Sequence, residues 1–305
     1  MRKILTILAL LACAVASAQT TAEEFRAKYE RQARIVGPAG VGVETILDRW
    51  AEAYPEDRYM LEGRYNYYFA KSHHTEIVSK PLEKFMGNEP LMTLKDSLGN
   101  NVNWFEEEFF NDDIFSQCAS AADRAIELYP QELAFRINLL NALLAYEKEC
   151  PDMVTMEICN LIDYSCTSDR KWVYEGQVID NDTFLSVIQE YCLAFYNIAS
   201  PDSYESFKTV SSKVLFYYPK NTQFLSNIGT YWLIAKKNDK SALKYYNKVL
   251  KINPNDYAAA KNCVLIARKS KNTKLEKKYL PAMIASTPSE GEKKSCEARL
   301  EALSK

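Results

Sequence analysis

The chain has 305 residues, 47% of them hydrophobic, and glycine and proline are scarce, with 9 and 11 residues. This composition favours helix. Lysine and arginine total 38 residues against 40 aspartates and glutamates, and this near balance argues against the basic surface of a nucleic-acid-binding protein.

Residues 1–18 have the features of a secretory signal that is removed before folding. Arg2 and Lys3 provide a basic start, and residues 4–12 form an apolar run that is too short to span a bilayer. A small-x-small cleavage site ends at Ala18. We therefore expect export to the periplasm or cell envelope.

A second interpretation of the same segment stays open. Residues 10–13 resemble a bacterial lipobox, which would acylate Cys13 and tether the chain as an outer-membrane lipoprotein. In both cases we expect residues 19–305 to form a single helical domain with two insertions.

Hydrophobic periodicity predicts helices along most of the chain. They are expected over residues 21–35, 43–54, 57–71, 111–129, 131–148, 152–164, 182–198, 200–218, the pair within 222–254, and 257–270, 275–285 and 289–303. The last of them is highly charged and suits the polar terminal cap of a stack of helices.

The first insertion, residues 72–112, does not follow the helical pattern. Two short apolar runs, 91–94 and 102–105, flank the turn-forming residues 96–101, which predicts a β-hairpin. The acidic residues of 106–113 are expected to be the solvated start of the next helix. A second insertion is expected over residues 165–180, with Trp172 as its apolar anchor.

Seven cysteines follow Cys13, and none forms a C-x-x-C pair, so neither a zinc knuckle nor a thioredoxin motif is indicated. The odd number implies at least one free thiol if the rest pair. Two interpretations stay open for four that cluster near the second insertion: they brace it as disulfides, or they are small buried helix residues. These four are Cys150, Cys159, Cys166 and Cys192.

One spacing recurs along the helices. Ala242, Tyr246, Val249 and Pro254 are separated by 4, 3 and 5 residues, which places three side chains on one helix face and a proline at its end. A second apolar-faced helix follows each such proline. The same offsets occur at Val43, Leu47, Trp50 and Pro55, at Cys118, Ala122, Ala125 and Pro130, and at Phe207, Ser211, Val214 and Pro219.

This unit resembles the tetratricopeptide repeat (TPR), a helix–turn–helix of about 34 residues. Residues 222–254 match best, with Ile228-Gly229 and Trp232 in the first helix, and they carry one extra residue in the turn near Asn238. Over about two thirds of the chain the resemblance implies an all-α fold, an α–α superhelix of TPR-like helix pairs with a small β-hairpin insertion. An ordinary helical bundle whose helices end with proline is the alternative.

The resemblance also implies a binding surface, because asparagines on the first helices of TPR units line a concave groove and hydrogen-bond an extended peptide. Asn138, Asn227 and Asn262 occupy one equivalent position, and Asn141 and Thr230 lie three residues further on the same face. An amide can both donate and accept, as a peptide main chain requires. The alternative is that these asparagines only occupy exposed helix faces.

The common motifs of catalysis are absent from the sequence: there is no Gly-rich phosphate loop, no H-E-x-x-H and no G-x-S-x-G. The two histidines, His73 and His74, are adjacent and would diverge by about 100° on a helix. A metal site that combines them with Glu106 or Asp112 is a weaker interpretation than a surface pair. We expect no catalysis and no cofactor.

These patterns favour a non-catalytic, exported TPR scaffold that binds a protein or peptide partner of the cell envelope in its concave groove. The alternative is an outer-membrane-associated glycan- or nutrient-binding accessory protein, in which Trp104, Trp172 and the aromatic residues of 59–69 stack on sugar rings. A third hypothesis is a metal-assisted hydrolase built on His73, His74 and the acidic run.

Overall fold

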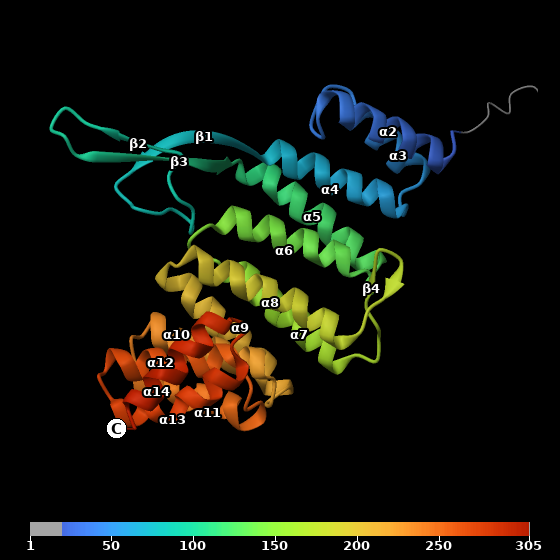
Figure 1. Cartoon of the computed structure of the whole chain (residues 1–305). Coiled ribbons are helices and arrows are strands. Elements are labelled where there is room, and N and C mark those ends of the chain that lie inside the picture. The colour runs from blue at the N-terminus through green and yellow to red at the C-terminus, as the bar shows by residue number, and fades with distance from the viewer. Residues whose placement is uncertain (1–19, 305) are drawn as a thin grey trace, which may run out of the picture. The chain divides into compact units, whose positions relative to one another are not determined.

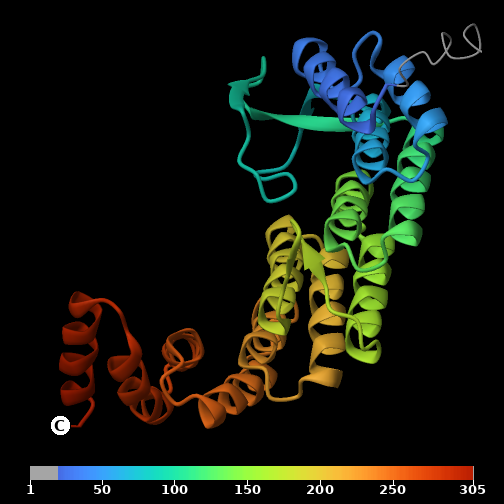
Figure 2. The same ribbon diagram turned by 90° about the vertical axis from the view of Figure 1, so that its right-hand side faces the viewer.

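The structure, a computed structural model, describes residues 20–304 and is drawn as a ribbon in Figures 1 and 2. Thirteen helices and five short strands lie in this part of the chain, and 67% helix confirms the predicted mostly α-helical fold. The expected signal over residues 1–18, with Cys13, lies outside the described residues. Within residues 20–304, no helix combines the length and the apolar character needed to cross a bilayer.

The chain divides into two compact units. Unit 1 comprises Met1–Ile77 and Glu106–Ala142, and unit 2 comprises Val78–Phe105 and Leu143–Lys305.

In unit 1 each helix packs on its neighbour in the chain, α2 on α3 and α3 on α4, and α4 packs on α5. Polar side chains cap the starts of α4 and α5: the Asp57 carboxylate accepts the backbone N–H of Tyr59, and the Asn111 side chain accepts that of Ile114. The helices are α2 (Ala22–Val36), α3 (Val43–Ala53), α4 (Arg58–Ser72), α5 (Asp112–Leu128) and the first part of α6 (Leu133–Glu147).

A three-stranded sheet interrupts the helices, with strand order β1-β3-β2. Its strands are β1 (His73–Lys80), β2 (Met92–Lys95) and β3 (Asn101–Phe110). Strands β2 and β3 pair antiparallel, with Met92 opposite Trp104, so the predicted hairpin is confirmed. The prediction that residues 106–108 begin a helix is wrong: they continue β3, because β1 supplies a partner strand, and the helix begins at Asp112 instead.

In unit 2 each helix from α8 onward packs against the next one in the chain, and α7 packs on α9 (Figure 2). The helices are α7 (Asp152–Thr167), α8 (Asn181–Ile198), α9 (Pro201–Tyr217), α10 (Thr222–Ile234), α11 (Asp239–Ile252), α12 (Tyr257–Lys269), α13 (Thr273–Ser286) and α14 (Glu290–Ala302).

Between α7 and α8 the chain forms a small two-stranded ribbon of β4 (Val173–Tyr174) and β5 (Gln177–Val178). Trp172, just before it, is 5% exposed, and its ring stacks on that of Phe184 at a centroid distance of 5.9 Å. The indole N–H donates to the Ser165 hydroxyl. Trp172 thus anchors this segment to α7 and α8.

The recurrent 4, 3 and 5 spacing predicts buried helix faces, and this is confirmed in all four copies. In each copy, the three helix positions of the spacing that come before the proline have side chains that are between 0% and 2% exposed. In α3, α5, α9 and α11 the C-cap residue directly precedes a proline. These C-cap residues are Tyr54, Tyr129, Tyr218 and Asn253. Because a residue before proline is disfavoured in the α region, the proline sets the helix end.

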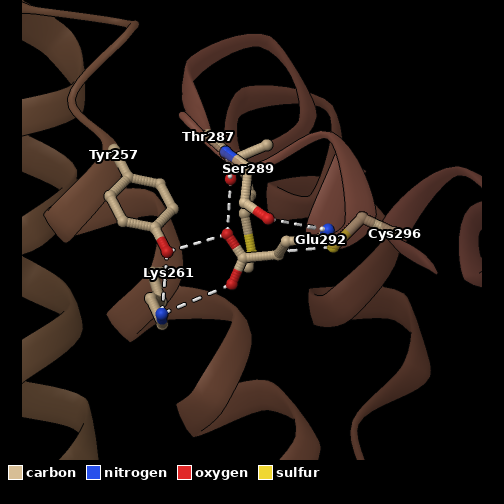
Figure 3. A network of polar contacts seen from close by, with 7 residues as sticks. Tyr257, Lys261, Thr287, Ser289, Glu292 and Cys296 are labelled. Atoms are coloured by element: carbon tan, nitrogen blue, oxygen red, sulfur yellow. Dashed lines mark hydrogen bonds and ion pairs between the residues drawn. The ribbon is translucent and has the colours of Figure 1, made fainter. Parts of the chain in front are cut away.

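Helix α14 is fastened to its neighbours by two carboxylates, and Figure 3 shows the first of them, Glu292. The Tyr257 hydroxyl of α12 donates to the Glu292 carboxylate at 2.7 Å, and the Lys261 ammonium lies 3.3 Å from its other oxygen. The Thr287 hydroxyl donates to the same group. These hydrogen bonds to Glu292 hold its pKa below the ordinary value, with the Thr287 bond contributing most.

The second carboxylate, Glu276 of α13, is 2% exposed. It lies 2.8 Å from the Arg268 guanidinium of α12 and 2.9 Å from the Arg299 guanidinium of α14. Arg299 first, and Arg268 after it, lower the pKa of this carboxyl against the opposing effect of burial. A buried carboxylate therefore ties three successive helices together.

All seven cysteines that the structure describes carry free thiols. Cys192 is buried in α8 and Cys150 is exposed. The disulfide brace considered for the second insertion is therefore not formed, and the alternative of a small buried helix residue describes Cys192.

Candidate functional site

The five candidate residues divide between the two units. Asn138 and Asn141 belong to the unit 1 part of α6, where Asn141 is exposed and the backbone carbonyl of Asn138 accepts a hydrogen bond from the Tyr65 hydroxyl at 2.8 Å. Asn227, Thr230 and Asn262 belong to α10 and α12 of unit 2.

Asn227 is an internal residue, only 6% exposed. Its amide nitrogen donates to the Gln189 side-chain oxygen of α8 at 2.8 Å and to the Ser211 hydroxyl of α9 at 3.2 Å. Gln189 donates back to the Asn227 oxygen at 3.4 Å. The expectation that Asn227 contacts a peptide directly is therefore corrected: its amide joins three helices from inside.

Thr230 is half-buried, and its hydroxyl shares a hydrogen bond of 3.0 Å with the hydroxyl of Tyr246. Asn262 is also half-buried, but its amide forms no hydrogen bond with any residue in the described part of the chain. Of the three candidates in unit 2, only Asn262 keeps a side-chain amide available to a ligand.

A groove runs between α8 and α10 and encloses a cavity of about 420 Å³. We call it the α8–α10 groove. Gln189, the hydrogen-bond partner of Asn227, is one of the residues that line it. Its other lining residues are Asp182, Leu185, Ser186, Glu190, Leu193, Asn221, Gln223 and Phe224.

Three amide side chains, Gln189, Asn221 and Gln223, line this groove. The Asn221 oxygen caps α10 by accepting the backbone N–H of Phe224 at 3.3 Å, which leaves its NH₂ group directed away from the helix backbone. Each amide can donate and accept at once. The groove therefore offers both kinds of partner that an extended backbone needs.

The charge of the groove is negative. Asp182 and Glu190 lie eight residues apart on α8, close to two helical turns, and both are exposed. No lysine or arginine lines the groove, and within residues 20–304 neither carboxylate forms an ion pair. Apolar contact is supplied by Leu193, whose side chain is 42% exposed, together with Leu185 and Phe224.

Gln189 does not follow the asparagine pattern of the repeat for a physical reason. The repeat positions are set by distance from a proline, and the segment before α8, residues 165–180, contains none. The available signal was the apolar face of α8, which places Gln189 next to buried Ile188 and one turn from Leu185.

The aromatic residues proposed to stack on sugar rings are mostly internal. Trp172 is held against Phe184, and Tyr65 and Tyr67 are 7% and 3% exposed. Tyr59 is exposed, but the Arg26 guanidinium covers its ring at 3.6 Å. Trp104, the other tryptophan of that hypothesis, is half-buried.

The histidines begin strand β1 rather than lying on a helix. The His73 ring contacts those of Phe69 and Phe110 at 4.8 and 5.0 Å, and its Nδ1 is hydrogen-bonded to the Phe69 carbonyl. His74 points elsewhere, to Glu76 at 2.9 Å. Among residues 20–304, no three side chains of His, Cys, Asp or Glu gather in a metal-binding arrangement.

Comparison with known proteins adds no identification, since no family model and no curated protein matches the chain.

Proposed function

We propose that this protein is a non-catalytic, exported scaffold of TPR-like helix pairs, and that it binds a peptide segment of a cell-envelope partner in the α8–α10 groove. The single observation behind this proposal is the groove itself, where three amides, the apolar side chain of Leu193 and two unpaired carboxylates meet.

The TPR-like arrangement is supported by three features of unit 2. The predicted inward faces of α9 and α11 are buried, and consecutive helices from α8 to α14 pack in order. Gly229 of α10 lies against the Tyr246 ring of α11, as close helix pairing within a unit demands. In such an arrangement α8 and α10 are both first helices of their units, and the groove between them lies on the inner, concave side.

The chemistry of the groove favours an extended segment with a basic side chain beside an apolar one. The Asn221 and Gln223 amides pair with the N–H and C=O groups of the segment, Leu193 receives the apolar side chain, and Asp182 or Glu190 receives the basic one. Charges of this kind contribute mainly to specificity and to the association rate.

Export to the periplasm or cell envelope is part of the proposal and is based on residues 1–18. Cleavage after Ala18 gives a free protein, and acylation of Cys13 gives a tethered one. Mass spectrometry of the native N-terminus distinguishes these two products.

The peptide proposal is tested by selecting a random peptide library on the purified protein and measuring the enriched peptides by fluorescence anisotropy. We expect the enriched peptides to carry lysine or arginine, and their affinity to fall as salt is added. Glu190→Gln is expected to weaken binding about two- to fivefold, as for a partly exposed ion pair.

The matched control is Glu297→Gln, which removes an exposed carboxylate from α14 of the same unit. Equal losses in the two variants, or enrichment of acidic peptides, would count against the α8–α10 groove. A charge reversal, Asp182→Lys combined with Glu190→Lys, gives a second test, since repulsion predicts a loss of tenfold or more.

A further inference from the structure

Unit 2 contains a second and larger cavity, which is separate from the α8–α10 groove. We propose that it binds a short saccharide, a neutral ligand with hydroxyl groups at its edges and apolar C–H faces. The inference does not depend on the peptide-binding function.

The cavity has a volume of about 710 Å³ and lies between the segment of residues 82–87 and the turn that joins α8 to α9. This volume is within the usual range for small-molecule sites. Two tyrosines, Tyr196 and Tyr204, line it, and their rings meet edge to face at 6.1 Å. Both are half-buried, so each is fixed by packing and still presents ring surface to the cavity.

The wall formed by residues 82–87 depends on one glycine. Gly87 has a φ of +79°, and a Cβ atom there would stand 2.1 Å from the backbone oxygen of Asn197 at the end of α8. Only glycine allows this approach. The wall is therefore a specific contact between a loop and a helix end.

The opposite side of the cavity is held together by hydrogen bonds. The Ser200 hydroxyl donates to the Glu149 carbonyl at 2.6 Å and accepts the Ser203 N–H at the start of α9. The Cys150 thiol donates to the Asp202 carboxylate at 3.2 Å. These bonds join the segment before α7 to the first turn of α9.

Two carboxylates and one paired lysine line the cavity. The carboxylates of Glu149 and Asp202 disfavour an anionic ligand and accept hydrogen bonds from hydroxyl groups, and the charge of the Lys84 ammonium is balanced by Glu89 at 2.5 Å. A neutral ligand that both donates and accepts hydrogen bonds uses all of these groups. Saccharide hydroxyls donate to carboxylates and accept from ammonium and phenol groups, while the C–H face of the sugar ring packs on tyrosine.

The test is calorimetric titration of the purified protein with maltose, cellobiose and chitobiose, with cadaverine and adenosine as a cationic and an aromatic comparison. We expect saturable binding of at least one disaccharide. Tyr204→Ala is expected to weaken it about tenfold, and Gly87→Ala to weaken it as well because the wall must move.

Phe216→Ala is the matched control, since Phe216 is an aromatic residue of the same helix, 76% exposed and outside the cavity. Asp202→Asn provides a variant that keeps the shape of the wall, and we expect weaker binding with an unchanged unfolding curve. As a second readout, the bound disaccharide slows alkylation of the Cys150 thiol.

The proposal is overturned if no disaccharide binds, if cadaverine or adenosine binds in place of one, or if Phe216→Ala weakens binding as much as Tyr204→Ala does. The proposal is supported if Tyr204→Ala and Asp202→Asn weaken disaccharide binding, Phe216→Ala does not, and all three variants still bind peptide. That result would leave the proposal for the α8–α10 groove unchanged.

Discussion

Gly229 of α10 lies directly against the ring of Tyr246 in α11: a Cβ atom at Gly229 would stand 2.7 Å from the nearest carbon of that ring. The Tyr246 side chain is fully buried, so the ring cannot turn out into solvent to make room. The distance between the two helices is thus set by the absence of a side chain.

Gly229→Ala is therefore expected to destabilise the protein, by about 1–3 kcal/mol for overpacking, reduced by the roughly 1 kcal/mol that alanine gains over glycine in a helix. Urea unfolding followed by circular dichroism measures the difference. Gly291→Ala in α14 is the control, because a Cβ there meets only the Ser289 hydroxyl at 3.9 Å. That variant is expected to be neutral or slightly more stable, and equal losses at both glycines would contradict the overpacking argument.

Asn227→Ala removes the central amide of a buried hydrogen-bonded group and leaves Gln189 and Ser211 without that partner. We expect a loss of about 1–3 kcal/mol in the free energy of unfolding. Asn262→Ala, at the equivalent repeat position but half-exposed, is expected to stay within about 0.5 kcal/mol of the parent. A stable Asn227→Ala protein with impaired peptide binding would restore the original assignment of Asn227 as a ligand-contacting residue.

The stability of the C-terminal helices is expected to depend on pH through Glu276. Arg299 and Arg268 hold the pKa of this carboxyl below its ordinary value of 4.5 in the folded protein. A depressed folded-state pKa contributes stability above the unfolded-state value, and this contribution is lost as the pH falls through the folded-state value. Hydrogen exchange of the α14 amides is measured from neutral pH downward and corrected for the intrinsic pH dependence of amide exchange, and the protection factors are expected to fall below about pH 4.5.

Glu276→Gln tests this assignment, because glutamine keeps the shape of the side chain and cannot titrate. The variant is expected to start with less protected α14 amides at neutral pH and to show a smaller acid-dependent change. An acid-dependent change as large as that of the parent would assign the effect to another carboxyl, with Glu292 as the nearest candidate in the same helix contact.

Cysteine reactivity is expected to follow burial. Desolvation raises the pKa values of the Cys118, Cys192 and Cys263 thiols to about 12, so these form little thiolate at neutral pH. Cys150 is exposed, but the hydrogen bond to Asp202 raises the pKa of its thiol. Peptide-level mass spectrometry after iodoacetamide treatment is expected to show Cys150 labelled well before these three, and faster labelling in Asp202→Asn. Equal labelling of Cys150 and Cys192 in the native protein would contradict the described burial.

The parts of the fold that sequence predicts well are those that depend on local rules. The positions before Pro55, Pro130, Pro219 and Pro254 are buried because helical period and proline stereochemistry both act within a few residues. The hairpin of β2 and β3 is local in the same sense, since a turn-forming segment lies between two short apolar runs.

The parts that it misses depend on contacts between distant residues. Residues 106–108 carry the charges of a helix start, but they continue a strand because β1, some 30 residues earlier, pairs with it. Asn227 and Asn262 share a repeat position, yet only Asn227 has a glutamine of another helix above it. Spacing identifies equivalent positions, and the neighbouring helix decides which of them reach solvent.

Helix α14 covers an apolar surface of the helices before it. Its Cys296 lies in the same apolar cluster as Leu280 and Met283 of α13, and Leu300 packs against that cluster. If the chain were cut before residue 289, this apolar cluster would be exposed to water. An exposed apolar surface of this kind favours association with other molecules. Helix α14 covers this cluster with its apolar side and turns charged residues such as Lys294, Glu297 and Glu301 outward, as a polar capping helix does in a stack of helices.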